Sequence, residues 1–254
     1  MMLKRCLMLF CISVLIVLCG CDNGAENSSN KHSEVKSAVK FSDAPEEYRE
    51  LLSDYENIVD FRFSKDFENE YNNGKFIELR STLKEELDSH TEESAHWYDM
   101  LVEMPYGRKF NSKDSFGYIL KDINNDGVLE LFWVNEDHFT LAVFTVKDGK
   151  AHLLDAFWPR YSCVVTDSGL LYTAGSGGAS VTQFTIRELN ENSEFNTLVQ
   201  FGTDGVDDNN LDVFYKVKDG TKNNITEKQF EELLSAYPFE NGKTFEETPI
   251  TPID

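Results

Sequence analysis

Hydrophobic residues recur along this chain with two different periods, and the change falls close to residue 111. From Tyr48 to Val59 they stand three and four residues apart, which is the spacing of one face of an α-helix. Asn72-Asn73-Gly74 ends that region. The helical spacing returns over Phe76–Leu87 and over Glu93–Met104. Residues 43–110 are therefore predicted to form a helical annex.

Beyond residue 111 the apolar residues form short runs or alternate with polar ones, as in β-strands. The links between the runs are short, and Lys147-Asp148-Gly149-Lys150 is one with turn residues. Short links favour neighbouring antiparallel strands, so a meandering sheet is predicted. The predicted strands are Ser115–Lys121, Leu129–Val134, Phe139–Val146, Ala151–Phe157, Ser162–Val165, Leu170–Ala174, Ser180–Leu189, Phe195–Phe201 and Leu211–Val217.

One predicted strand is apolar on both faces. In Leu129–Val134, alternate positions put Leu129, Leu131 and Trp133 on one face. Phe132 and Val134 then lie on the other face. A strand of this kind is predicted to lie in the centre of the sheet, covered on both sides.

A last helix is predicted after the strands. Thr226 and Gln229 stand at the spacing of a capping box, and Pro238 ends the apolar stripe that follows. The fold class is therefore predicted to be α+β, with N-terminal helices packed on a meandering, mainly antiparallel β-sheet and a C-terminal helix. Residues 111–254 are predicted to form a β-rich domain with the C-terminal helix, and we expect them to build one globular unit with residues 43–110.

The N-terminus has the features of a signal segment. A basic start, Met1–Arg5, precedes the apolar run Cys6–Leu18, which is too short for a comfortable transmembrane helix. The run ends in Leu18-Cys19-Gly20-Cys21, which resembles the lipobox of bacterial lipoproteins. That resemblance implies that residues 1–20 are removed and that Cys21 carries a lipid anchor on the outer, extracytoplasmic face of the cell membrane. An ordinary signal peptide with an incidental cysteine is the alternative.

The composition limits what the chain can bind. Residues 21–42 are polar and without apolar period, so we predict a flexible tether. The formal net charge of −21 opposes binding to nucleic acid, whose phosphates are also negative. After removal of the signal and lipidation of Cys21, Cys163 is the one free thiol, which excludes an internal disulfide. Its apolar neighbours favour a buried small side chain over a nucleophile.

The stretch Asp122–Glu130 lies between two predicted strands and carries oxygen atoms at alternate positions. Calcium is bound by six to eight oxygen ligands in flexible geometry, and alternation in a tight turn directs such ligands inward. We therefore predict a Ca2+ site, and the predicted ligands are Asp122, Asn124, Asp126, the backbone carbonyl of Val128, and Glu130. Gly127 allows the chain to reverse there.

The spacing distinguishes this loop from an EF-hand, since Trp133 stands where a bidentate glutamate would be needed. The pattern DxNxDGxxE instead resembles the DxDxDGxxD calcium loops of FG-GAP propeller repeats, with Glu130 in place of their last aspartate. The alternative is a metal-free Asx turn around Asn125-Asp126-Gly127. Such a turn does not require Asp122 and Glu130, so the metal site is favoured.

Other stretches give weaker signals. The second acidic stretch, Asp204–Asp212, lacks the alternation and is predicted to be a solvated loop. Gly175–Gly178 has neither the lysine of a phosphate loop nor the frame of a nucleophilic serine, and favours a bend or a close approach of strands. Glu136-Asp137-His138 is predicted to be a polar turn. No nucleophile–base pair is found, so catalytic residues are predicted to be none.

Together, the lipobox, the helical annex, the loop Asp122–Glu130 and the Gly175–Gly178 segment are similar to a loose family of uncharacterised lipoproteins of Gram-positive bacteria. The resemblance implies surface anchoring and calcium, and no known reaction. The expected function is that of a lipid-anchored, calcium-binding protein whose sheet binds an unknown protein or envelope ligand. The alternative is a cell-surface hydrolase that acts on envelope polymers or peptides.

Overall fold

The computed structural model describes residues 44–75, 115–157, 160–237, 244–245 and 248–252, all of which fall within one compact unit of residues 36–254. The helices described are α2 (Glu46–Arg62), α3 (Phe67–Asn72) and α6 (Glu227–Ala236). The strands are β1 (Phe116–Lys121), β2 (Glu130–Asn135), β3 (Thr140–Lys147), β4 (Lys150–Ala156), β5 (Tyr161–Val165), β6 (Leu171–Gly178), β7 (Val181–Leu189), β8 (Phe195–Val206), β9 (Asp212–Lys218), β10 (Thr221–Ile225) and β11 (Thr251–Pro252).

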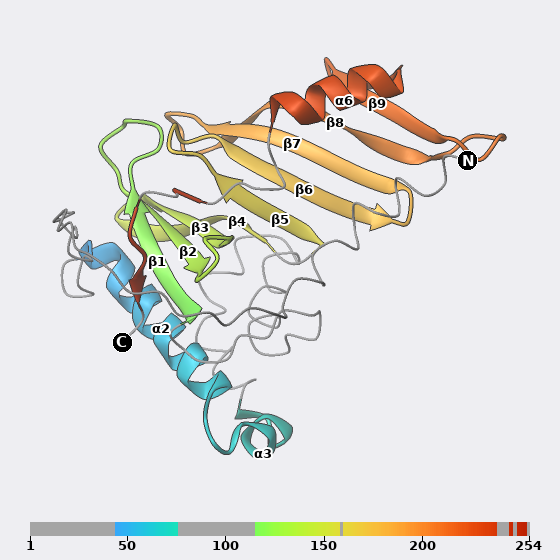
Figure 1. Cartoon of the computed structure of the whole chain (residues 1–254). Coiled ribbons are helices and arrows are strands. Elements are labelled where there is room, and N and C mark those ends of the chain that lie inside the picture. Colours follow the sequence, from blue (N-terminus) through green and yellow to red (C-terminus); the bar gives the residue numbers. More distant parts are fainter. Residues whose placement is uncertain (1–43, 76–114, 158–159, 238–243, 246–247, 253–254) are drawn as a thin grey trace, which may run out of the picture. The chain divides into compact units, whose positions relative to one another are not determined.

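All these strands belong to one antiparallel sheet, shown in Figure 1, in the order β10-β9-β8-β7-β6-β5-β3-β2-β1-β11. Strand β4 lies off this path and pairs with β3. The outer edge of β3 is therefore divided: Ala142–Lys147 pairs with β4, whereas Thr140 pairs with Cys163 of β5. We call β1–β4 with β11 the first half-sheet and β5–β10 the second half-sheet. In the described sheet, the ladder between β3 and β5 joins the halves through that single residue pair.

Helix α2 covers one face of the first half-sheet. Its buried residues recur at helical spacing, and they pack with residues of β1–β4 in one hydrophobic cluster. Tyr55 stacks on Trp133 of β2, with ring centroids 3.8 Å apart. Trp133 is completely buried, so this aromatic pair lies at the centre of the cluster.

The other face of the first half-sheet packs against the second half-sheet. Phe132 and Val134 of β2 belong to a second cluster with Cys163, Leu171 and other residues of β5–β7. Every residue of β2 is buried. The prediction of a central strand covered on both sides is therefore confirmed for Glu130–Asn135, although Leu129 lies outside the strand and is 41% exposed.

Helix α6 packs on the second half-sheet over β8 and β9, as Figure 1 shows. Thr226 and Gln229 form the predicted capping box at its start. Phe230 of the helix contacts Phe201 and Phe214, with ring centroids 5.8 and 4.7 Å apart. These contacts place α6 on one face and leave the opposite face of β7–β9 turned away from it.

The predicted α+β class, with its antiparallel sheet, N-terminal helix and C-terminal helix, is confirmed. The strand β10 was missed, because Thr221-Lys222-Asn223-Asn224-Ile225 is polar and lies at the edge of the sheet. Strand β8 continues to Val206, into the stretch predicted as a loop. The signal segment, the tether and the helices predicted over Phe76–Leu87 and Glu93–Met104 lie outside the described residues.

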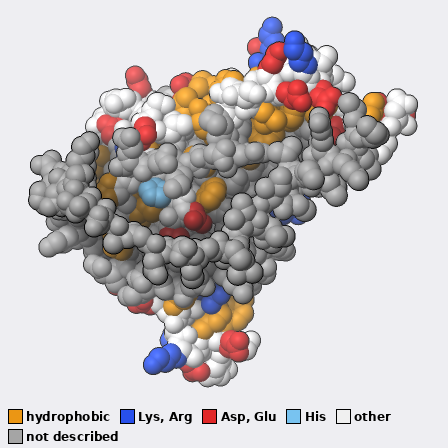
Figure 2. Space-filling view, in the orientation of Figure 1, with side chains coloured by type: hydrophobic (Ala, Val, Ile, Leu, Met, Phe, Trp, Pro, Cys, Tyr) orange, Lys and Arg blue, Asp and Glu red, His pale blue; other side chains and the backbone are white. Residues whose placement is uncertain are grey.

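None of the helices that the structure describes is both long and apolar enough to cross a membrane. The chain carries a net charge of −21, and Figure 2 shows acidic side chains at several separate places on one face of the molecule.

Candidate calcium loop

The predicted calcium loop connects β1 to β2. Lys121 and Glu130 are opposed in the ladder, so the pairing of the two strands brings the two ends of the loop together. Asn125 and Gly127 both have positive φ angles, of 61° and 90°. Asparagine and glycine are the residues that adopt this backbone region at least cost, and they let the chain reverse within a few residues.

Three side chains of the loop accept hydrogen bonds from its own backbone. Asp122 Oδ2 accepts from the N–H of Gly127 at 2.9 Å, and Asn124 Oδ1 accepts from that of Asp126 at 3.2 Å. Asp126 Oδ1 accepts from the N–H of Val128 at 2.8 Å. These bonds direct the oxygen-bearing side chains at the first, third and fifth positions toward the inside of the loop.

One oxygen of the loop stands apart from this pattern. Asp122 Oδ1 is inaccessible to solvent and has no hydrogen-bond partner among the described residues. A buried polar atom of this kind costs free energy, because the water that it loses is not replaced by a protein group. The loop therefore contains a carboxylate oxygen with an unfilled bonding capacity.

Glu130 is completely buried at the end of the loop. Its Oε2 accepts a hydrogen bond from the N–H of Ile123 at 3.1 Å, and its Oε1 accepts one from Thr145 Oγ1 at 3.1 Å. Burial raises the pKa of Glu130 to about 7, with a smaller contribution from the negative charges of Asp126 and Asp122. The hydrogen bonds from Ile123 and Thr145 lower that pKa and offset part of the rise.

The loop contains the oxygen atoms that calcium prefers as ligands, but its carboxylates are not gathered around one point. Within the described ranges, no three His, Cys, Asp or Glu side chains are grouped so that they could hold a metal ion. The predicted ligand set also includes the amide oxygen of Asn124 and the backbone carbonyl of Val128, which are not among these four kinds of side chain. Each carboxylate oxygen of Glu130 can accept a further bond, and Asp122 Oδ1 is free to do so. The loop therefore offers oxygen ligands of the kind that calcium binds.

Groups from distant parts of the chain hold the loop from outside, and sequence reasoning missed them. The hydroxyl of Tyr48 in α2 donates to the carbonyl of Leu129 at 2.7 Å. Burial, with Glu130 nearby, raises the pKa of Tyr48, so the hydroxyl keeps its proton. Asn124 Nδ2 donates to the carbonyl of Asn190, in the turn between β7 and β8, at 3.1 Å.

The other candidate residues from the sequence, where the structure describes them, are part of the β-sheet or its turns. Cys163 is buried, and burial raises the pKa of its thiol, so the thiolate that a nucleophile needs is disfavoured. Gly175–Gly178 ends β6, where the register with β7 shifts between Ser176 and Gly178. His138 Nδ1 lies 2.9 Å from the carbonyl of Thr244. The predicted lipidation site, Cys21, lies outside the described residues.

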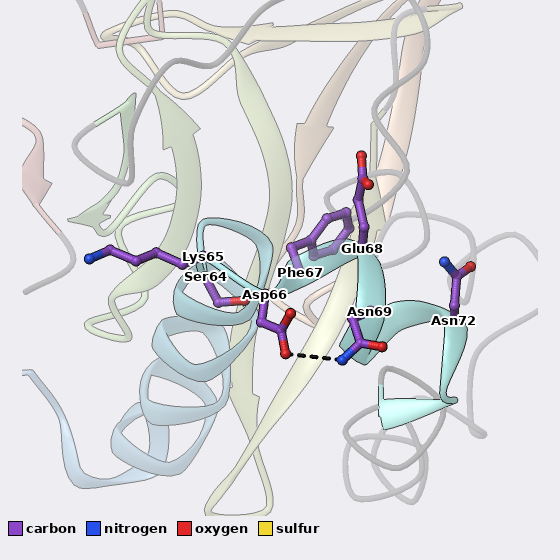
Figure 3. Close-up of a pocket in the computed structure, with 7 residues that line it drawn as sticks. All are labelled: Ser64, Lys65, Asp66, Phe67, Glu68, Asn69 and Asn72. Carbon is purple, nitrogen blue, oxygen red and sulfur yellow. Dashed lines mark hydrogen bonds between the residues drawn. The ribbon is translucent and has the colours of Figure 1, made fainter.

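Figure 3 shows a hollow beside α3. Most of its lining side chains are polar, and Asn69 Nδ2 donates to Asp66 Oδ2 across it at 3.1 Å. The residues that line it are Ser64, Lys65, Asp66, Phe67, Glu68, Asn69 and Asn72. None of the residues predicted as a site lies in this hollow.

In comparisons with known proteins, the chain matches no family model, no curated protein and no solved structure.

Proposed function

We propose that this chain is a lipid-anchored, extracytoplasmic protein that binds calcium in the loop Asp122–Glu130 and uses its sheet as a binding module. The sequence supports the anchor through Leu18-Cys19-Gly20-Cys21. The loop supports the ion through its alternating oxygen atoms. The sheet supports binding through a polar face on its second half.

The observation that carries the calcium proposal is the buried, unpartnered oxygen Asp122 Oδ1. In a metal-free Asx turn, the side-chain oxygen accepts a hydrogen bond from a nearby backbone N–H. Such a turn does not require a buried carboxylate oxygen without a partner. The remaining ligands would be the side chains of Asn124, Asp126 and Glu130 and the carbonyl of Val128. The ion supplies positive charge where Asp122, Asp126 and Glu130 otherwise repel one another.

The binding role is assigned to the face of the second half-sheet that is turned away from α6. Directly opposed residues of neighbouring strands point to the same face. One row across six strands carries hydroxyl, amide and glycine positions, and a neighbouring row contains threonines and a glutamine. The first row is Tyr161, Gly175, Gln183, Gly202, Tyr215 and Asn224, of which Gln183 and Asn224 are exposed. In the second row, Thr173 and Thr185 are buried, so the binding role is assigned to the exposed positions of the first row. Such a face offers hydrogen-bond donors and acceptors to a polar envelope ligand.

Calorimetric titration of the full chain in detergent tests the calcium proposal. We expect binding of CaCl2 with measurable heat and a higher melting temperature in calcium than in EDTA. Asp126→Asn keeps an oxygen for the N–H of Val128 but removes a charge, so it should lower stability in calcium and leave it nearly unchanged in EDTA. Absence of both heat and a melting shift in the wild type would overturn the proposal, as would an equal loss in EDTA.

Fractionation of cells that express the full chain tests the anchor. The wild type should be found with the membrane, and Cys21→Ser should leave the membrane fraction after the signal is removed. Cys19→Ser is the matched control, since it changes a neighbouring cysteine that is removed with the signal. An unanchored wild type, or equal release of both variants, would contradict lipidation at Cys21.

Co-sedimentation with isolated bacterial envelopes tests the binding face. Gln183 lies in the middle of the first row and is exposed, so Gln183→Glu should reduce the amount of protein that sediments. Glu232→Gln on the exposed surface of α6 is the control of opposite charge change. If the wild type does not sediment, or if both variants sediment equally with it, the role assigned to this face is wrong.

A further inference from the structure

Asn124 differs from the other predicted ligands because its side chain has both an acceptor and a donor. The N–H of Asp126 can only donate, so it fixes the side-chain oxygen of Asn124 toward the inside of the loop. The side-chain nitrogen then lies on the other side of the amide from this bond and donates to the carbonyl of Asn190 at 3.1 Å. It also donates to Asp126 Oδ2 at 2.8 Å.

The carbonyl that Asn124 contacts belongs to the residue that organises the turn between β7 and β8. The side chain of Asn190 accepts hydrogen bonds from the N–H groups of Asn192 and Glu194, at 2.8 and 3.0 Å. Its carbonyl accepts from the N–H of Ser193 at 3.0 Å. Asn124 therefore holds the turn at its first residue, although 66 positions separate the two in the chain.

This contact crosses between the two half-sheets. The loop belongs to β1 and β2, whereas the turn ends β7, which lies in the second half-sheet. The backbone register between the halves consists of the pair Thr140 and Cys163. A side-chain bond at the loop is thus well placed to affect how firmly the second half-sheet is held.

We propose that Asn124 couples calcium binding in the loop to the rigidity of the turn 190–194. This inference rests on the proposed calcium function. An ion on the side-chain oxygen of Asn124 draws electron density from the amide, which makes its N–H groups stronger donors to Asn190. Because coupling is reciprocal, a well-held turn also favours the ion. An aspartate at this position would bind the ion but would face the Asn190 carbonyl with an acceptor.

Hydrogen–deuterium exchange of the full chain, with and without CaCl2, tests the coupling. We expect calcium to slow exchange of the Asn192, Ser193 and Glu194 amides about fivefold or more in the wild type. In Asn124→Asp, calorimetry should still show calcium binding, while the turn should no longer be slowed. Asn209→Asp adds the same charge in the turn between β8 and β9 and should behave as the wild type.

The outcomes separate this inference from the function on which it rests. If the wild type shows no heat with calcium, the proposed function fails and the coupling fails with it. If the wild type binds calcium but exchange at 190–194 is unchanged, the coupling is wrong and the calcium function stands. If Asn124→Asp does not fold or bind, Asn124→Ser, which keeps an oxygen and loses the amide nitrogen, is measured instead. Calcium-dependent slowing of the turn in either binding variant would overturn the role of Asn124.

Discussion

Two acidic loops of this chain use similar turn chemistry and differ in what they bury. The loop between β1 and β2 and the turn between β8 and β9 each contain an asparagine with positive φ, Asn125 at 61° and Asn210 at 60°. In both, aspartate side chains accept hydrogen bonds from backbone N–H groups. In the second, Asp207 Oδ1 accepts from Asn209 and Leu211, each at 2.9 Å.

The two loops differ in the burial of their carboxylates, because only the first loop has carboxylate oxygens that are inaccessible to solvent among those compared. Asp207 is exposed, and its bonds to backbone N–H groups lower the pKa of its carboxyl. In the first loop, Glu130 is fully buried with a raised pKa, and Asp122 Oδ1 is buried without a partner. An acidic stretch alone therefore indicates little about metal binding. The placement of carboxylates at the start of a central strand, where they are desolvated, is what separates the two loops.

The largest effect that would sharpen this comparison is a dependence of stability on pH in the absence of metal. The pKa of Glu130 is raised from 4.5 to about 7, so the folded state holds the proton more tightly than the unfolded state. Its contribution to stability is present below pH 4.5 and is lost as the pH rises to about 7. The loss is on the order of 3 kcal/mol.

Urea unfolding in EDTA at several pH values measures this loss. The wild type should lose stability over this range relative to Glu130→Gln, which cannot ionise. The corresponding change in the second loop, Asp207→Asn, should follow the wild type in the same range. Parallel curves for the wild type and Glu130→Gln would show that the desolvation of Glu130 is not costly.

The next effect concerns the unpartnered oxygen of Asp122. At a calcium concentration 100 times the dissociation constant, binding to the folded state alone adds about 2.7 kcal/mol to the free energy of unfolding. Asp122→Asn should lose most of that increment, because it replaces a charged ligand, while the oxygen that accepts from Gly127 can be kept. Unfolding with and without calcium measures the increment. A full increment in Asp122→Asn would remove this residue from the ligand set.

The sequence predicts the first loop well because the signal is local. Alternating oxygens, Gly127 and the two-sided apolar strand after the loop are all adjacent in the chain, and the structure places them as a loop entering the buried strand β2. The contacts that hold the loop could not be predicted. Tyr48 donates to a backbone carbonyl 81 positions away, and Asn190 receives a bond at its own backbone carbonyl. Every residue has a backbone carbonyl, so the sequence does not indicate which carbonyl will accept a hydrogen bond from a distant side chain.

The branched edge of β3 was beyond prediction for a related reason. Short links indicate that neighbouring strands pair, and β3 with β4 follows this rule. The pairing of Thr140 with Cys163 depends on how the second half-sheet packs on Phe132 and Val134, which is a tertiary effect. The polar strand β10 has no apolar alternation, because one of its edges has no strand partner in the described sheet.

A smaller effect is expected from comparing two of the glycines with positive φ, one in the first loop and one near the end of β8. Gly127 and Gly205 have φ angles of 90° and 82°, and a Cβ atom at either would meet nothing within 4 Å. Substitution by alanine therefore costs backbone strain alone, about 1 kcal/mol at each position. In EDTA the two variants should unfold at similar urea concentrations. In calcium, Gly127→Ala should lose more than Gly205→Ala, and equal losses would argue against an ion in the first loop.

The smallest expected effect is a loss of stability at low pH that involves Asp207 in the second loop. The pKa of Asp207 is lowered from 3.8, so its contribution to stability is present above that pH and is lost as the pH falls through the lower value of the folded state. Asp207→Asn keeps an oxygen for the N–H groups of Asn209 and Leu211, so it should be near wild type at neutral pH and less sensitive to acid. Asp208→Asn removes the same charge without touching these bonds and is the control in thermal melts. A calcium-dependent change in Asp207→Asn would mean that the second loop also binds the ion, and the contrast between buried and exposed carboxylates would no longer explain the difference.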